Sequence, residues 1–364
     1  MLEIQWKAAA QPLTGAWRDY PIPPRGTSLL GISFRPLQAA AFGLDTRAAL
    51  KTLLGYSFQL VRLGAYWNQF EPVPGKFLSD ELDWQIDAAE KAGKQIIICV
   101  GPVKTFGYPE FFVPAHRLAA PFPERSRIRP SAYADLLGAA TDWIARLVEH
   151  YRGCGSLIAW QLEHEAVDPL GIEHSWRLDA DFVAREALAL HQADPTRPLV
   201  MNGFLPATWP GRLMQAWRTR DQGDSLALAR RLADWVGVDD YPRIALLAIS
   251  RKTVYLDGSR SARAQRNRRD LLAWARAKGK RLLVTEGQAE PWETTTTPPS
   301  LPGKAMYSCR PEDLIATYAA WKAASAQEGP LFAYLFWGAE YWLLRQAGGD
   351  DSYIQAFNRI LDAG

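Results

Sequence analysis

Short apolar runs recur along the whole chain, and a segment with helical periodicity follows most of them. Eight runs have the length and composition of buried strands. These are 29–34 (LLGISF), 58–64 (FQLVRLG), 95–101 (QIIICVG), 157–163 (LIAWQLE), 198–204 (PLVMNGF), 235–241 (WVGVDDY), 281–287 (RLLVTEG) and 331–337 (LFAYLFW). Between them, apolar residues return every three or four positions, which predicts helices over 80–93, 131–151, 179–193 and 311–327. This alternation predicts right-handed β-α-β units and a parallel sheet.

The number of strands points to a closed barrel. Eight strands close into a (β/α)8 barrel, and 364 residues accommodate that fold with enlarged loops on its catalytic face. A doubly wound open sheet is the alternative, but no glycine-rich phosphate-binding fingerprint follows any of the strands. No stretch is rich enough in Pro, Gly or Ser to divide the chain. We therefore expect an α/β fold, a single TIM-barrel domain over 1–364, with 1–26 as a segment that precedes the barrel.

Composition and charge narrow the possible partners and the location. The net charge is only +3, so neither a nucleic-acid partner nor an anionic membrane is expected. The basic stretch 260–281 has Leu and Trp at helical spacing and is better explained as a solvated helix face. Cys99, Cys154 and Cys309 lie far apart, which argues against a disulfide framework or a zinc site.

The N-terminus has no signal-peptide core and no run reaches transmembrane length, so we expect a cytoplasmic protein. We also expect no cofactor. The oligomeric state cannot be read from the sequence.

Polar and aromatic residues gather where the expected strands end, and in a (β/α)8 barrel that edge carries the active site. Those singled out as catalytic or substrate-binding are Arg62, Trp67, Glu163, His164, Glu165, Asn202, Tyr241, Glu286, Trp337 and Glu340. The carboxylates after the fourth and seventh strands, Glu165 and Glu286, would face each other across the mouth. Two opposed carboxyl groups are what glycoside hydrolysis requires. The flat rings among the 15 tryptophans also suit the apolar faces of sugars.

Several of these residues have a second interpretation. Glu163 shares strand parity with Glu165, so it either binds substrate or belongs to a structural ion pair. His164 alternates to the other side of an ideal strand, and only an irregular strand end would let both His164 and Glu165 face a sugar. Arg62 could instead form a salt bridge in the barrel core.

Taken together, the motifs resemble clan A of the glycoside hydrolases, which are retaining β-glycosidases on a (β/α)8 barrel. WQLEHE (160–165) resembles that clan's strand-four ending, and VTEGQAEPW (284–292) resembles its strand-seven ending with the nucleophile. VRLGAYWNQFEPVPGKF (61–77) and LDWQIDAAEKAGKQIIICVGP (82–102) are particularly close to the family 42 β-galactosidases. The resemblance extends from about Leu29 to Trp342.

The resemblance implies roles for individual residues. Glu165 would be the general acid/base and Glu286 the nucleophile of a two-step retaining mechanism. Arg62 and Tyr241 would hold the nucleophile, and Trp337 would form the floor beneath the reacting sugar. The implied substrate is an oligosaccharide or glycoside, namely a β-galactoside, β-glucoside or β-mannoside.

His164 departs from the clan pattern. Most members have Asn at this position, and its side chain binds the sugar 2-hydroxyl. A His-Glu pair occurs in the family 26 mannanases, so the departure leaves the sugar open. The chain is also much shorter than a family 42 enzyme.

Two other functions fit the same fold. A non-catalytic sugar-binding barrel would lack one of the two carboxylates, and both are present. A metal-dependent hydrolase of the amidohydrolase kind needs His-x-His after the first strand, and GISFRPLQ (31–38) contains none. The strand-end residues favour the glycosidase.

Overall fold

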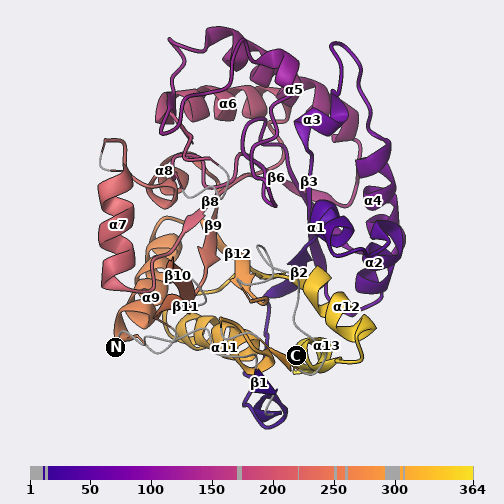
Figure 1. Cartoon of the computed structure of the whole chain (residues 1–364), viewed down its shortest axis with the longest axis vertical. Coiled ribbons are helices and arrows are strands. Elements are labelled where there is room, and N and C mark those ends of the chain that lie inside the picture. The colour runs from indigo at the N-terminus through magenta and orange to yellow at the C-terminus, as the bar shows by residue number, and fades with distance from the viewer. Residues whose placement is uncertain are drawn as a thin grey trace.

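Eight parallel strands close into a barrel at the centre of the molecule, and helices surround it (Figure 1). The computed structural model describes residues 11–12, 15–169, 174–219, 221–249, 252–258, 261–291, 304–305 and 308–363. In chain order the barrel strands are β2 (Leu29–Ser33), β3 (Leu60–Gly64), β4 (Gln95–Cys99), β6 (Leu157–Gln161), β8 (Leu199–Phe204), β9 (Trp235–Asp240), β12 (Arg281–Gln288) and β14 (Ala333–Trp337). Each coincides with one of the eight apolar runs, and the predicted (β/α)8 fold is confirmed.

The side chains of each barrel strand alternate between two apolar layers, because successive residues of a strand point to opposite faces. Ile97 lies inside the barrel, whereas its neighbours Ile96 and Ile98 belong to the larger core between strands and helices. The interior layer is formed by Leu60, Ile97, Ala159, Val200, Leu283, Ala333 and Leu335. Both faces are buried, which explains why the runs are continuously apolar. The barrel is filled, and the polar strand ends lie at its mouth.

Amphipathic helices cover the outside of the barrel. They are α1 (Pro36–Ala41), α2 (Thr46–Leu54), α3 (Trp67–Phe70), α4 (Asp80–Lys91), α5 (Ala134–Tyr151), α6 (Ala180–Ala193), α7 (Trp209–Thr219), α8 (Ser225–Leu232), α9 (Ala262–Ala277), α11 (Pro311–Glu328), α12 (Ala339–Ala347) and α13 (Ser352–Asp362). The basic stretch forms α9, as expected. Asp45, Asp179, Asp224 and Ser261 each cap a helix by accepting a hydrogen bond from a backbone N–H of its first turn. None of the described helices combines the length and apolarity needed to cross a bilayer.

Short ladders join the loops outside the barrel. β5 (Arg127–Ile128) pairs with β7 (Arg177–Leu178), which ties the loop after β4 to the loop after β6. Further pairs join β10 (Arg243–Ile249) to β11 (Lys252–Asp257) and β1 (Gln11–Pro12) to β13 (Lys304–Ala305), and single-turn helices occupy Ala16–Arg18 and Ala115–Arg117. Of the segment expected before the barrel, residues 1–10 and 13–14 lie outside the described part of the chain.

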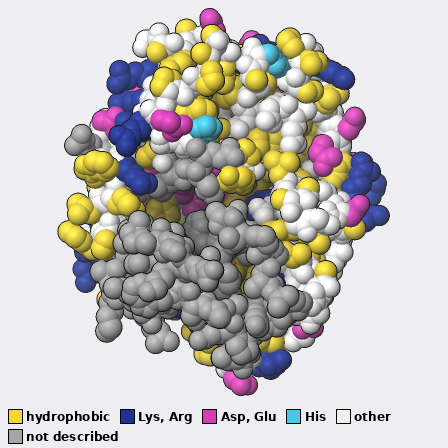
Figure 2. Space-filling model, viewed as in Figure 1, with side chains coloured by type: hydrophobic (Ala, Val, Ile, Leu, Met, Phe, Trp, Pro, Cys, Tyr) yellow, Lys and Arg dark blue, Asp and Glu magenta, His cyan; other side chains and the backbone are white. Residues whose placement is uncertain are grey.

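One helix keeps large apolar side chains in solvent. Trp209, Leu213 and Trp217 of α7 are 58%, 54% and 67% exposed. Their spacing of four residues places them on one face of the helix. Apolar side chains accordingly gather at the left edge of the molecule, over α7 (Figure 2).

Candidate active site

The carboxylate of Glu286, near the end of β12, is held by two donors from other strands. Arg62 of β3 donates from Nη2 to Oε1 at 2.5 Å, and the hydroxyl of Tyr241, directly after β9, donates to Oε2 at 2.5 Å. The side chain is 2% exposed, and burial alone would raise the pKa of Glu286. The electrostatic attraction of His164 and Arg62 and the two hydrogen bonds outweigh burial, so the pKa is lowered and the group is ionised at neutral pH.

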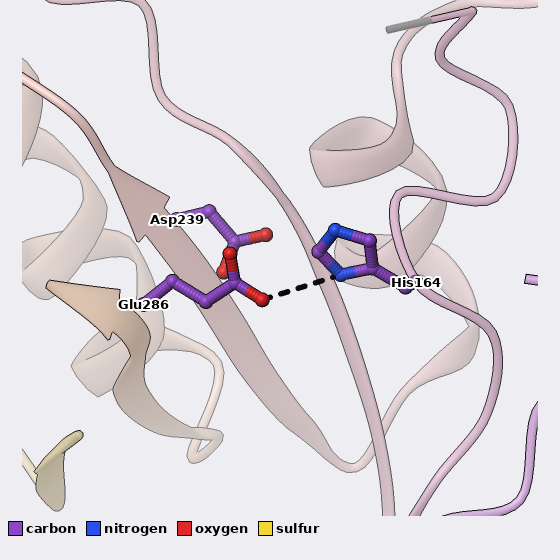
Figure 3. Close-up of side chains that lie close together, drawn as sticks. All are labelled: His164, Asp239 and Glu286. Carbon is purple, nitrogen blue, oxygen red and sulfur yellow. Dashed lines mark ion pairs between the residues drawn. The ribbon is translucent and has the colours of Figure 1, made fainter. Parts of the chain in front are cut away.

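His164 faces Glu286 across the mouth of the barrel. Figure 3 shows Glu286 and Asp239, on the neighbouring strands β12 and β9, pointing toward its imidazole ring. Nδ1 of His164 lies 3.5 Å from Oε1 of Glu286. Burial lowers the pKa of His164 to about 4, so the ring is neutral at pH 7. At pH 7 the charge of Glu286 is therefore held by Arg62 and the hydroxyl of Tyr241 rather than by an imidazolium.

The chain leaves β6 through two residues with left-handed backbone. Glu163 and Glu165 have φ angles of 49° and 42°, which are uncommon for residues other than glycine. Lys104 holds this segment. Its carbonyl oxygen accepts from the backbone N–H of His164 at 2.8 Å, and its Nζ donates to the carbonyl oxygens of Glu165 and Asp168 at 2.8 and 3.0 Å. The irregular end breaks the strand alternation, so His164 and Glu165 both lie at the mouth.

Glu165 shares its surroundings with other carboxyl groups. It is 9% exposed, and a hydrogen bond joins its side chain to that of Asp239. Burial raises the pKa of Glu165 well above its usual value, and the negative charges of Asp239, Asp168 and Glu286 raise it further. The pKa values of Glu165 and Glu286 are thus shifted in opposite directions within one site.

Asn202 of β8 organises the centre of the site. Its Oδ1 accepts from Nε2 of Gln161 at 3.2 Å and from the backbone N–H of Glu165 at 3.3 Å. Its Nδ2 lies 2.5 Å from Oδ2 of Asp239 and 3.0 Å from Nδ1 of His164. The backbone donor fixes which end of the amide is oxygen, so Nδ2 donates to His164 and the ring proton sits on Nε2. All four hydrogen-bonding positions of Asn202 are occupied by protein groups.

Glu163 turns away from the mouth. Its carboxylate accepts from the backbone N–H groups of Val103 and Lys104 at 3.0 and 2.5 Å, and the side chain is 1% exposed. Glu186 of α6, fully buried, contacts it from behind. Burial raises the pKa of Glu163 to about 7 and that of Glu186 well above its usual value. The two carboxyl groups are therefore best described as sharing one proton.

The two tryptophans expected to bind sugar occupy different places. Trp337, at the end of β14, is partly exposed and packs edge-to-face with Phe106 at 6.0 Å between ring centres. Trp67 is 1% exposed, stacks on Trp143 at 5.8 Å, and donates from Nε1 to Glu71 at 2.8 Å. The ring of Trp67 has no face at the mouth.

Glu340 is also turned inward. It lies in the first turn of α12, is fully buried, and binds Arg35 through both carboxylate oxygens. The structure thus brings Arg62, His164, Glu165, Asn202, Tyr241, Glu286 and Trp337 together at the mouth and directs Trp67, Glu163 and Glu340 into the protein.

Three residues near the site did not stand out in the sequence. Asp239 is one of two adjacent aspartates at the end of a buried strand, and a carboxylate in that position is a signal that a sequence can show. Lys104 follows the end of β4, and Arg35 follows the end of β2. A cation shortly after a buried strand is a weaker signal of a functional site. Lys104 is fully buried and Arg35 is 2% exposed.

His164, Asp239 and Glu286 offer ligand atoms that all lie within 4.8 Å of one another, a spacing at which they could hold a metal ion (Figure 3). Arg62 already donates to Oε1 of Glu286 and would place a fixed positive charge beside the ion. The donor set therefore fits a divalent cation poorly.

Comparison with known proteins defines the fold but not the family. No family model matches the chain, and no curated protein matches it. Among solved structures, xylanase 10B from Thermotoga maritima is 13% identical, with a TM-score of 0.56 and coverage of 94% of this chain and 98% of that one. A GH5_18 variant from Streptomyces cattleya in complex with Manb1-4GlcNAc is 15% identical, with a TM-score of 0.57 and coverage of 85% and 70%.

A GH10 endoxylanase from a sugarcane soil metagenome is 15% identical, with a TM-score of 0.56 and coverage of 94% and 99%. At these identities the comparisons show a shared (β/α)8 fold. The similar solved structures belong to glycoside hydrolase families 5 and 10, and the likeness of this chain to family 42 stays a prediction.

Proposed function

We propose that the protein is a glycoside hydrolase that cleaves β-glycosidic bonds with retention, with Glu286 as nucleophile and Glu165 as general acid/base. One observation carries this proposal: two buried carboxyl groups at one barrel mouth have pKa values shifted in opposite directions. A double-displacement glycosidase needs one carboxyl group ionised and the other protonated at the start of the reaction. The barrel shared with glycoside hydrolases adds support at the level of fold.

In the first step, Glu286 attacks the anomeric carbon while the bond from that carbon to the leaving oxygen breaks. Glu165 gives its proton to the leaving oxygen, and Glu286 becomes a glycosyl ester. In the second step, Glu165 takes a proton from water, the water oxygen attacks the anomeric carbon, and Glu286 leaves as a carboxylate. Arg62 and Tyr241 stabilise the negative charge on Glu286 before the first step and after the second.

Asp239 affects how Glu165 changes role. The charge of Glu286 disappears in the ester, which lowers the pKa of Glu165 only by the part that Glu286 contributes. Burial and the charge of Asp239 contribute more to the raised pKa of Glu165. Asp239 is therefore expected to keep Glu165 protonated in the free enzyme, through its charge and as the acceptor of their shared hydrogen bond.

The proposed substrates are β-linked oligosaccharides or glycosides. The resemblance in sequence favours a galactoside, glucoside or mannoside. The solved neighbours add β-1,4-linked xylose and Manb1-4GlcNAc to the sugars worth testing. His164 lies beside the nucleophile, with Nδ1 3.5 Å from Oε1 of Glu286, and the Nε2–H of its ring would bind a hydroxyl of the reacting sugar.

The test is hydrolysis of a panel of aryl β-glycosides (galactoside, glucoside, mannoside, xyloside) together with xylo-oligosaccharides and Manb1-4GlcNAc. Wild type is compared with Glu286→Ala and Glu165→Ala. Glu149→Ala, which changes a surface glutamate whose side chain is 68% exposed, is the matched control. We expect turnover of at least one sugar by wild type and by the control, and a loss of roughly 10⁴-fold or more in Glu286→Ala.

Azide separates the two roles. It should restore turnover of Glu165→Ala with an activated aryl glycoside and give a β-glycosyl azide, because azide needs no base to attack the ester. With Glu286→Ala it should give the α-glycosyl azide. Full activity in Glu286→Ala would refute the assignment of the nucleophile, and binding of these sugars without turnover by wild type would identify a binding protein.

A further inference from the structure

Two buried carboxylates hold the guanidinium of Arg35 by its edge. Arg35 follows β2 by two residues. Its Nε and Nη2 donate to Oε2 of Glu340 at 3.0 and 2.7 Å, and its Nη1 and Nη2 donate to Glu290 at 2.6 and 2.9 Å. The backbone N–H of Arg35 also donates to Glu340, at 2.7 Å. All three side chains are at most 4% exposed. Because all three guanidinium nitrogens donate hydrogen bonds to these two carboxylates, the orientation of the guanidinium plane is fixed.

The face of this guanidinium lies against Trp337. Cζ of Arg35 is 4.3 Å from the centre of the indole ring, closer than Cζ of Arg62 at 5.8 Å. Fully buried tryptophans are held differently: Nε1 of Trp160 and Trp342 donate to Asp194 and to a backbone carbonyl. Among the described residues, none accepts a hydrogen bond from the indole N–H of Trp337. The guanidinium of Arg35 and the edge-to-face contact with Phe106 are therefore the restraints on the orientation of this partly exposed ring.

The carboxylates that hold Arg35 also lie beside the residues that follow Trp337. Gly338 has φ of 126°, and a Cβ atom at this position would lie 2.5 Å from Cβ of Glu290. Glu340 follows two residues later, at the start of α12. Glu290 itself comes four residues after Glu286. The same three charged groups thus connect the segments that follow β12, which carries the nucleophile, β2, the first barrel strand, and β14, which carries the ring.

We propose that Arg35 is a positioning residue, which fixes the plane of the Trp337 ring while Glu290 and Glu340 fix Arg35. This inference rests on the proposed function, in which Trp337 is the floor beneath the reacting sugar. Arg35 is covered by the ring and by its carboxylates, so it acts on substrate only through Trp337.

A double-mutant cycle tests this route of action, with kcat and KM measured on the best substrate of the panel. Arg35→Lys keeps the charge but cannot bridge two carboxylates in one plane, and we expect KM to rise about tenfold with a smaller change in kcat. Trp337→Ala should raise KM at least as much. The double variant should equal Trp337→Ala alone, because Arg35 has nothing left to position. Multiplicative effects on KM would overturn the proposal.

Arg345→Lys is the matched control. Arg345 is equally buried, pairs with Asp350, and lies 5.9 Å from the ring of Tyr341, away from the mouth. Its KM should match that of wild type. If Arg345→Lys raises KM as much as Arg35→Lys, the effect of Arg35 is one of general stability and the proposal fails.

A second readout does not depend on activity. In protein labelled with 5-fluorotryptophan, the ¹⁹F resonance of Trp337 is assigned from Trp337→Phe. Arg35→Lys should shift or broaden this resonance and leave that of Trp160 in place. An unmoved Trp337 resonance would overturn the positioning role even in an active enzyme. If the resonance moves and no sugar is hydrolysed, the proposed function fails and the positioning role stands.

Discussion

Tyr241→Phe removes a hydroxyl that is one of the two donors keeping Glu286 ionised, and it keeps the aromatic ring in place. Burial and the nearby charge of Glu286 raise the pKa of Tyr241, so its hydroxyl stays protonated and donates. A hydrogen bond to a charged group contributes about 1.5–3 kcal/mol. One pKa unit corresponds to about 1.4 kcal/mol, so the pKa of Glu286 should rise by roughly one to two units. The nucleophile must be ionised, and the acidic limb of kcat/KM should move by the same amount toward higher pH.

The measurement is the pH profile of kcat/KM for wild type, Tyr241→Phe and Tyr318→Phe. Tyr318 is fully buried and its hydroxyl has no hydrogen-bond partner among the described residues, so its loss should leave the profile unchanged. Thermal unfolding checks that all three proteins are folded at each pH. An acidic limb that stays in place in a folded Tyr241→Phe protein would refute the claim that this hydroxyl holds the pKa of Glu286 down.

Two further changes test the surroundings of the acid/base. Asp239→Asn removes a charge that raises the pKa of Glu165, so the alkaline limb of kcat/KM should move to lower pH; an unmoved limb would contradict this. Lys104→Met removes two hydrogen bonds that hold the left-handed segment 163–165. In a folded protein kcat should therefore fall about 10²-fold. An unchanged kcat would show that the segment keeps its conformation without Lys104.

The pKa of Glu186 is raised by burial and by Glu163, so the stability due to its protonated form is complete below about pH 4 and is lost as pH rises. Glu186→Gln should therefore raise Tm more at pH 8 than at pH 5 in scanning calorimetry, and equal shifts at the two pH values would count against a shared proton.

The fold could be predicted because its signals are local. Strands buried on both faces must be continuously apolar, and runs such as 95–101 and 281–287 have this property. The mouth could be located for the same reason, since residues that follow such runs meet at one edge of the barrel. Arg62 needed only its place in a strand to be directed to this edge, whereas Glu286 lies beside a register shift in β12 that no local pattern predicts.

The inward-turned residues depend on information that no local pattern carries. Glu340 binds an arginine 305 positions away, and Trp67 is packed against Trp143 from another helix. The parity of Glu163 predicted a side chain at the mouth, and the left-handed backbone after β6 instead turns it toward the N–H groups of the loop after β4. A positive φ at a glutamate cannot be read from sequence, because it is imposed by tertiary contacts.

The different surroundings of Glu286 and Glu165 explain how one site can shift the pKa values of two carboxyl groups in opposite directions. Glu286 lies in β12 beside a shift in the pairing register of that strand, where neighbouring elements bring Arg62 and Tyr241 to fixed positions around its charge. Glu165 lies on the irregular segment, where no cation among the described residues forms an ion pair with its carboxylate and Asp239 adds a second negative charge. A regular strand at position 165 would have turned Glu165 or His164 out of the mouth. The unusual backbone is therefore required to place a protonated acid opposite an ionised nucleophile.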